Sequence, residues 1–327
     1  MKQKQSLYEC FPRELKEALF TWFLPKHQLQ EIRMRTNQPL ILRCDGEEFS
    51  IDGQGLRVKE RKHAKLVSDK EIQDTLAYMS DYSLYAYEEE IRQGFLTMKN
   101  GCRVGICGKV IVENGNIKNI YPISSVNIRF PSERKGCSSP LLEHLVEKKK
   151  GNIVSTLIIS PPMCGKTTML RDLIWQISNG NQENQWDGKT VGVVDERGEL
   201  AACHLGVPQH DLGIRTDVLD GCPKVQGMMM LVRTMAPDVI AVDEIGSEEE
   251  LKAMQYGMNC GCSILATAHG DSLEELQKKQ VFRSIKAEQL FQRYVILSNR
   301  YGAGTIESIY DRDGKLLCSI GRREQID

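Results

Sequence analysis

The sequence of 327 residues lacks a surplus of charge of either sign. Lysine and arginine total 43, aspartate and glutamate total 44, and the formal net charge is −1. Such a balance argues against a protein whose main role is to coat nucleic acid, although it leaves a local basic patch open. A run that interleaves basic and aromatic residues is also missing, and this disfavours a protein that binds single strands.

Cysteine pairs and long apolar runs are missing as well. The eleven cysteines are scattered from Cys10 to Cys318, and no Cys-x-x-Cys pair occurs among them. Their odd number and wide spacing disfavour a disulfide framework or a zinc site and suit a reducing cytosol. The longest apolar stretch near the N-terminus, Ala18–Leu24, is far short of the ~20 residues of a membrane span. Charged residues precede it, so an amphipathic helix is expected there and not a signal peptide.

Length and composition predict two folded domains. Hydrophobic residues make up 41% and charged residues 27%, a balance that excludes disorder as the dominant state. We expect an α+β domain over residues 1–135, with a helix near 12–24 and a helix over 70–79 that Asp69 caps. Two β-hairpins are expected at Asn100-Gly101 and Asn114-Gly115.

The second half has a different pattern. A polar, turn-rich stretch marks the boundary, a linker with a helix follows over 136–150, and a second domain covers 151–327. Short β runs alternate there with helical stretches; they read TLIIS, TVGVVD, DVIAVDE and SILATA. This alternation is typical of an α/β fold with a parallel sheet and crossover helices. A C-terminal antiparallel meander is expected to complete the domain.

A phosphate-binding loop is predicted where the first of these strands meets a helix. The candidate residues are Ser160, Pro161, Pro162, Met163, Cys164, Gly165, Lys166, Thr167 and Thr168. Strand, tight loop, Gly-Lys-Thr and helix form the context in which backbone N–H groups face anionic phosphates. Lys166 would contact the β and γ phosphates, and Thr167 would offer its hydroxyl to Mg²⁺. The alternative is a strand-to-helix turn that spells Gly-Lys-Thr by chance.

The loop departs from the usual G-x-x-x-x-G-K-[ST] pattern at two positions. Ser160 replaces the first glycine, and Met163 stands where many such loops have glycine. We expect both residues to cost conformational freedom, on the order of 1–2 kcal/mol for a non-glycine residue held left-handed.

Two acidic pairs follow later strands. One strand ends in Asp195-Glu196-Arg197, and another ends in Asp243-Glu244. The carboxyl ends of parallel strands meet at one sheet edge, so these acids are expected beside the phosphate loop. Asp243 would hold Mg²⁺, Glu244 would polarise the attacking water, and Glu196 would assist. For any single acid, a helix cap or a loop charge is the simpler interpretation.

The remaining candidates are one histidine and several arginines. His269 ends the SILATA strand at the same edge, where it would contact the γ-phosphate region. Arg233 precedes the strand that leads to Asp243, where it would reach the acids or only support packing. Arg103 lies in the N-terminal β region and is either a solvated strand residue or an arginine finger that acts on a neighbouring subunit.

These motifs together resemble the secretion ATPases of type II and type IV secretion and of pilus retraction. The chain is more closely similar to the stage III sporulation protein AA family, through EIRMRTNQPL, GCRVGICGKV, SSVNIRF, CGKTTMLRDL, VVDERGELA and ATAHG. The resemblance extends from about Glu31 to the C-terminal meander.

The resemblance implies a RecA-like ATPase domain behind a smaller N-terminal domain, with ATP and Mg²⁺ bound between the subunits of a homo-hexamer. It also implies a place in the mother cell, at the membrane facing the forespore, and membrane proteins of the same sporulation operon as partners. The alternatives are a RecA-like nucleic-acid translocase, and a scaffold that binds nucleotide but has lost catalysis through the altered loop.

Overall fold

The computed structural model describes residues 7–98, 101–130, 134–147, 151–181, 186–276 and 278–319. The chain forms two compact units. The first contains Met1–Ser132 and Ala202–Gln209, and the second contains Glu133–Ala201 and His210–Asp327. The division falls close to the expected limit at residue 135, but the sequence pattern did not place Ala202–Gln209 with the first unit.

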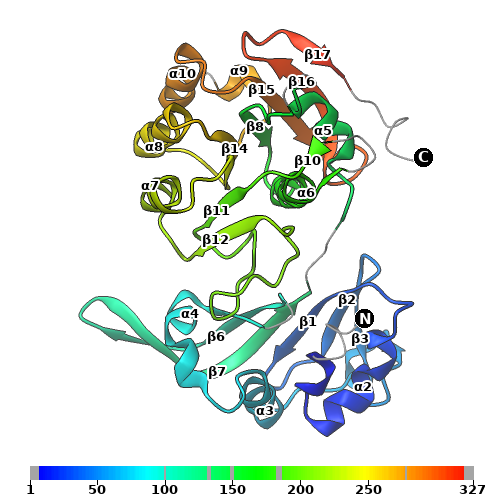
Figure 1. Ribbon diagram of the computed structural model, residues 1–327. Helices are drawn as coiled ribbons and strands as arrows, with labels where there is room; N and C mark the ends of the chain where they lie inside the picture. The colour runs from blue at the N-terminus through cyan, green and yellow to red at the C-terminus, as the bar shows by residue number, and fades with distance from the viewer. Residues whose placement is uncertain are drawn as a thin grey trace. The chain divides into compact units, whose positions relative to one another are not determined.

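The first unit is built on an antiparallel sheet of seven strands in the order β4-β3-β2-β1-β7-β6-β5 (Figure 1). The strands are β1 (Leu29–Arg35), β2 (Ile41–Cys44), β3 (Glu47–Ile51), β4 (Arg57–Val58), β5 (Phe95–Thr97), β6 (Arg103–Glu113) and β7 (Asn116–Arg129). The predicted hairpin at Asn114-Gly115 joins β6 and β7, and both turn residues have positive φ. Asn100 of the other predicted turn lies outside the described residues, although β5 and β6 do pair antiparallel.

The longer helices of the first unit, α2 (Arg13–Phe23) and α3 (Asp69–Met79), bury their apolar faces in its core. The unit also contains the short helices η1 (Arg61–His63) and η2 (Leu84–Tyr87), and α4 (Glu88–Gln93). The predicted amphipathic helix is confirmed as α2, which buries Leu15, Leu19 and Trp22. The N-cap of α3 is Ser68 and not Asp69 as expected. Ser68 is favoured as the N-cap because it forms a capping box with Glu71, in which each side chain accepts the backbone N–H of the other residue.

The second unit has a mixed sheet in the order β12-β11-β13-β14-β8-β15-β16-β17. Its strands are β8 (Thr156–Ser160), β11 (Val191–Asp195), β12 (Thr216–Asp220), β13 (Val239–Val242), β14 (Ser263–His269), β15 (Arg293–Ser298), β16 (Thr305–Asp311) and β17 (Leu316–Cys318). All pairs from β12 to β15 are parallel, and β15, β16 and β17 pair antiparallel. The predicted parallel sheet and C-terminal meander are therefore confirmed. A separate two-stranded ribbon joins β9 (Gly180–Asn181) and β10 (Trp186–Asp187).

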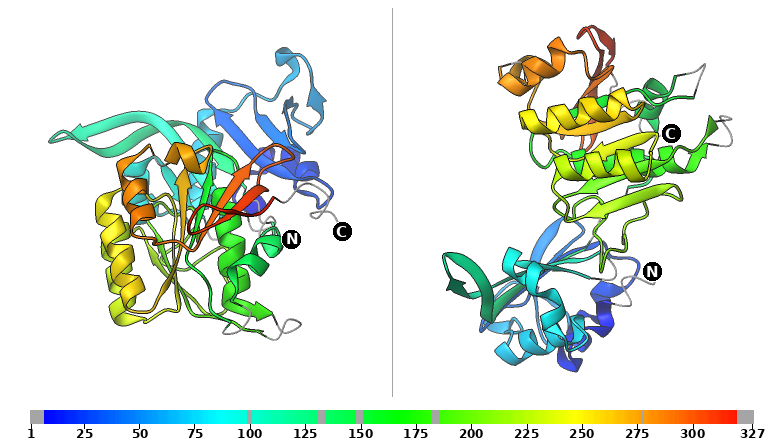
Figure 2. Two further views of the ribbon diagram at one scale, coloured as in Figure 1. Left: turned by 90° about the horizontal axis from the view of Figure 1, so that it is seen from above. Right: turned by 60° about the vertical axis from the view of Figure 1, so that its left-hand side comes forward.

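Helices cover both faces of this sheet, which is typical of an α/β fold. The helices are α5 (Ser139–Leu145), α6 (Lys166–Asn179), α7 (Lys224–Thr234), α8 (Glu248–Asn259), α9 (Leu273–Leu276) and α10 (Gln280–Ala287). Figure 2 shows α7 and α8 on one face and α6 on the other. Because both faces are covered, the central strands β8, β11 and β13 are buried along their whole length.

Among the described helices, none combines the length and apolar character needed to cross a membrane.

Candidate functional site

The predicted phosphate loop lies between β8 and α6. Ser160 is the last residue of β8, and Gly165 precedes the first helical residue, Lys166. Gly165 has a φ of +85°, and a Cβ there would lie 2.9 Å from the backbone nitrogen of Gly304. Gly304 donates its N–H to the carbonyl of Cys164. Glycine is therefore required at position 165 both for its conformation and for this close approach.

The two departures from the usual loop pattern differ in their consequences. Met163 has a φ of +61°, so the expected left-handed residue is present, and its side chain is 94% exposed. Ser160 was expected to carry a similar cost, and that expectation is wrong. Ser160 continues β8 with a negative φ, so no glycine is needed there, and its hydroxyl bonds the carbonyl of Pro161. Pro162 is exposed, and Thr168 is half-buried in the first turn of α6.

Lys166 lies inside the loop with 5% of its surface exposed. Its ammonium group donates to the carbonyls of Ser160 and Pro161 at 3.3 and 3.2 Å, and it lies 3.1 Å from Nδ1 of His269. Burial lowers the pKa of Lys166, and the carboxylates of Asp243 and Glu244 oppose that shift. The ammonium group is thus held by neutral acceptors at the mouth of the loop, where an anionic ligand would stabilise its charge.

Sheet register explains why His269 lies here. His269 pairs with Ser160 across β14 and β8, so the predicted histidine stands directly beside the loop. Its Nε2 lies 2.7 Å from Oε1 of Glu244. Because an ammonium can only donate and a carboxylate only accept, the neutral tautomer with hydrogen on Nε2 satisfies both neighbours. His269 therefore bridges the loop lysine and the acidic pair.

The predicted metal-binding residues also come together. Thr167 Oγ1 donates to Oδ2 of Asp243 at 2.7 Å, and the other carboxylate oxygen of Asp243 accepts from the hydroxyl of Thr267. A hydroxyl and a carboxylate at this separation are the hard oxygen donors that Mg²⁺ prefers, with phosphate and water as its other ligands. The residues present therefore fit a magnesium ion, which Thr167 and Asp243 would hold.

Glu244 has the most constrained position of the site. Its φ is +53°, a left-handed conformation that costs a non-glycine residue about 1–2 kcal/mol. Its carboxylate is bound on both sides, by His269 and by Nη1 of Arg197 at 2.9 Å. Its backbone N–H donates to Thr267 Oγ1 at 2.8 Å. The carboxylate thus points along the same edge as the loop and the Thr167–Asp243 pair, as the sequence predicted.

The acids after β11 have different surroundings. Asp195 is buried, and its carboxylate accepts the N–H groups of Glu199, Leu200 and Ala201 at 2.7–3.1 Å. Burial raises its pKa, and these three bonds oppose the shift. Asp195 therefore shapes the loop that leaves β11. Glu196 lies 3.4 Å from Nζ of Lys224, and both line a cavity shared with Asp243 and Glu244.

The two arginine candidates belong to different units of the chain. Arg233 is exposed in the last turn of α7. Lys224, which lines the cavity beside Asp243 and Glu244, begins the same helix, about 13 Å away along its axis. The predicted reach of Arg233 to the acids of its own chain is therefore wrong. Arg103 belongs to the first unit, where it pairs with Arg129 across β6 and β7 and its guanidinium lies 3.8 Å from the ring centre of Phe95. Action of Arg103 on a neighbouring subunit remains a prediction.

Sequence reasoning missed three residues of the site. Arg197 was noted only as part of an acidic motif, yet it binds Glu244. Thr267 stands two residues before His269, and this alternation along β14 is the signal that would have found it. Lys224 begins α7, twenty residues before Glu244 in the chain, and no motif points to it.

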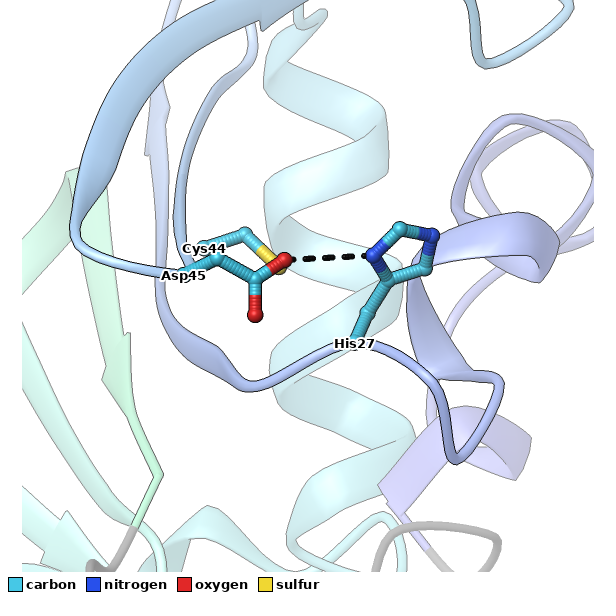
Figure 3. A group of neighbouring side chains, drawn as sticks. All are labelled: His27, Cys44 and Asp45. Carbon is cyan, nitrogen blue, oxygen red and sulfur yellow. Dashed lines mark hydrogen bonds and ion pairs between the residues drawn. The ribbon is translucent and has the colours of Figure 1, made fainter.

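A second polar cluster lies in the first unit (Figure 3). Nδ1 of His27 is 3.2 Å from Oδ2 of Asp45, and the thiol of Cys44 is 3.4 Å from the same oxygen. The three candidate ligand atoms lie within 4.8 Å of one another. Asp45 also accepts the N–H of Gln28 at 2.9 Å. These bonds account for the cluster as a link between the loop before β1 and the turn that joins β2 to β3.

Comparison with known proteins places the chain in a family. The model of the family described as sporulation stage III, protein AA matches residues 1–317. The chain belongs to this family. Its relative in Bacillus subtilis (strain 168), stage III sporulation protein AA, is 40% identical over 312 residues, which cover 94% of this chain and 95% of that protein. The resemblance drawn from the sequence is confirmed.

Solved structures of secretion ATPases share the fold of this sporulation family member. The ATPase DotB of Yersinia pseudotuberculosis matches with a TM-score of 0.57 at 12% identity, over 96% of this chain and 81% of that one. The pilus retraction motor PilT, solved with bound ADP, matches with a TM-score of 0.53 at 13% identity, over 94% and 82%. The predicted RecA-like fold is therefore confirmed, and at these identities the likeness concerns the fold alone.

Proposed function

We propose that the chain binds and hydrolyses ATP as the motor of a secretion-type machine in sporulation. One observation carries the proposal: Glu244 is held between His269 and Arg197, next to the Thr167–Asp243 pair and the phosphate loop. This arrangement puts a general base, a pair of metal ligands and a phosphate cradle at one sheet edge. The fold shared with secretion ATPases and the sporulation family of the chain support it.

In this proposal the triphosphate lies on the backbone N–H groups that begin α6. Lys166 turns from its carbonyl acceptors to the β and γ phosphates, because a charged acceptor binds an ammonium more strongly than a neutral one. Thr167 and Asp243 would hold Mg²⁺, which would neutralise part of the phosphate charge. Glu244 accepts a proton from water as the water oxygen bonds to the γ-phosphorus and the bond from that phosphorus to the bridging oxygen breaks. ADP and inorganic phosphate leave.

His269 connects the two halves of this chemistry. It contacts Lys166 through Nδ1 and Glu244 through Nε2. When the γ-phosphate takes Lys166 away from His269, the histidine gains a free acceptor that can bond a protonated phosphate oxygen or water. The His269 ring therefore couples the presence of the γ-phosphate to the hydrogen bonding of the general base, Glu244. Glu196 assists from the side of the cavity next to Lys224.

The family supports a more specific role in the cell. We propose a homo-hexameric ring in the mother cell, associated with the membrane facing the forespore through membrane proteins of the same operon. The ring would energise assembly of, or transport through, a channel between the two cells. Arg103 would then complete the site of a neighbouring subunit.

ATP turnover across a series of protein concentrations tests the proposal, with Glu244→Gln as the control. We expect specific activity to rise with concentration and to fall about 10²-fold or more in Glu244→Gln, which keeps its nucleotide affinity. Equal turnover in the variant would remove Glu244 from its role. Nucleotide binding without turnover in either protein would favour the alternative of a scaffold that binds nucleotide but has lost catalysis.

A further inference from the structure

Lys224 is placed against the local preference of its helix. It is the first residue of α7, follows Pro223, and has no acidic residue beside it in the first turn. A positive charge at the amino end of a helix is unfavourable because the helix dipole is positive there. Its side chain is nonetheless 10% exposed. A buried cation in an unfavourable position needs compensating partners from elsewhere in the fold.

Those partners come from three separate segments at the site. Nζ of Lys224 donates to the backbone carbonyl of Glu244 at 2.8 Å. It also lies 3.4 Å from a carboxylate oxygen of Glu196, after β11, and 3.4 Å from one of Glu250, in α8. Lys224 thus ties together the loop after β11, the loop after β13 and the beginning of α8.

The contact with Glu244 is the one with a consequence for the reaction. Glu244 has a positive φ, so its carbonyl points where it would not point in an extended strand. Lys224 binds that carbonyl while Thr267 binds the N–H of the same residue. Backbone strain at a functional site persists only when the surroundings hold it. With both backbone groups fixed, the side chain is aimed between His269 and Arg197.

Glu250 completes the arrangement from the other side. Its Oε2 accepts the N–H groups of Gly246 and Ser247, in the turn that follows Glu244, at 2.7 and 3.0 Å. Its Oε1 faces Lys224. One carboxylate therefore fixes the turn and orients the lysine that fixes Glu244.

From this geometry we propose that Lys224 is a positioning residue, which holds the backbone of Glu244 in the left-handed conformation that aims its carboxylate at the attacking water. The inference rests on the proposed function, since it assigns Glu244 the role of general base. The two lysines differ in role: Lys166 contacts phosphate, whereas Lys224 acts through the backbone of Glu244.

Lys224→Met tests the proposal in the full chain. Methionine preserves much of the buried volume and removes the ammonium group. We expect kcat for ATP to fall about 10- to 100-fold, because a misplaced catalytic group loses this much, with KM and the affinity for ADP changed less than about threefold. Lys252→Met, at an exposed position on α8, is the matched control and should keep full turnover.

Two further variants separate positioning from folding. Glu250→Gln retains the capping box, which accepts glutamine, but removes the charge that orients Lys224, so a smaller loss of kcat is expected. Lys224→Ala should regain turnover with added propylammonium and not with tetramethylammonium at equal ionic strength. A lysine that served only folding would show no such rescue.

The outcomes distinguish the inference from the function on which it rests. Turnover of Lys224→Met within twofold of the unaltered protein would overturn the positioning role and leave the ATPase in place. A rise in KM with unchanged kcat would overturn it as well, because Lys224 would then bind nucleotide. Absence of turnover in the unaltered protein would overturn the proposed function, and the inference would fall with it.

Discussion

At the scale of single residues, the phosphate loop combines one strained residue with one residue that must be glycine. Met163 has a left-handed backbone conformation, and its side chain is exposed, so burial of that side chain does not offset the strain. Gly165 is left-handed and close to the backbone of Gly304. The first position tolerates change because its cost is local, and the second does not because a Cβ would meet backbone atoms that cannot move aside.

Met163→Gly is expected to stabilise the second unit by up to about 1 kcal/mol. Relief of the left-handed strain exceeds the greater chain entropy that glycine loses on folding. Urea unfolding measures the change, and Met163→Ala is the control because it removes the side chain and keeps the strain. Nucleotide affinity should be equal in the two variants. Weaker binding by Met163→Gly alone would show that the strain itself prepares the loop.

Gly165→Ala is expected to be more damaging than the strain alone explains. Left-handed alanine costs about 1–2 kcal/mol, and the contact with the nitrogen of Gly304 adds to it. Gly261→Ala is the matched control, since Gly261 has a φ of +97° and nothing lies within 4 Å of a Cβ there. We expect Gly165→Ala to unfold at lower urea than Gly261→Ala and to lose about tenfold or more in nucleotide affinity. Equal unfolding midpoints would contradict the close approach.

At the scale of elements, α3 shows how one carboxylate can begin a helix and join it to a neighbouring segment. Glu71 completes the capping box with Ser68, and Lys65 lies 2.7 Å from its second oxygen. Both side chains are mostly buried. Burial by itself raises the pKa of Glu71, but the bonds from Lys65 and Ser68 outweigh it, and the pKa is lowered below 4.5.

The stability of the first unit should therefore depend on pH through Glu71. A lowered pKa in the folded state means that the ionised carboxylate stabilises above about pH 4.5, and that this contribution is lost as the pH falls through the folded-state value. Glu71→Gln keeps the capping box and loses the ion pair, so we expect it to cost about 1–2 kcal/mol at pH 7. Urea unfolding from pH 7 to pH 3 should show the two proteins converging below pH 4.5. A constant difference would contradict the assignment.

The same elements show which features sequence patterns capture. The strands β8, β11, β13 and β14 were predicted because buried parallel strands are short, continuous apolar runs between helices. The N-cap of α3 was misplaced by one residue because Ser68 and Asp69 are both good caps, and only the spacing to Glu71 separates them. Asp243 and Glu244 were found because residues just after parallel strands gather at one sheet edge. Lys224 was not found from the sequence, because its role depends on contacts with segments that are distant from it in the chain.

At the scale of the whole molecule, the chain passes from the second unit to the first between Ala201 and Ala202, a few residues after Asp195. Asp195 holds the N–H groups of Glu199, Leu200 and Ala201 in the second unit. The adjoining segment, Ala202–Gln209, belongs to the first unit. There Nδ1 of His204 lies 3.1 Å from the carbonyl of Thr97, and its ring stacks on Tyr87. The link between Asp195 and His204 is therefore a short stretch of chain that is held at both ends.

Because both ends of that link are held, nucleotide binding at the site should change the dynamics of the segment Ala202–Gln209 in the first unit. We expect nucleotide to slow hydrogen exchange of Ala202–Gln209 by about threefold or more, relative to the amides of α2. His204→Ala should abolish this response and leave nucleotide affinity unchanged, because its partners Thr97 and Tyr87 lie outside the site. His63→Ala, at an exposed position in η1, is the control. Slowed exchange that persists in His204→Ala would mean that the connection is carried by the rest of the segment, and no change in the unaltered protein would mean that the two units respond to nucleotide independently.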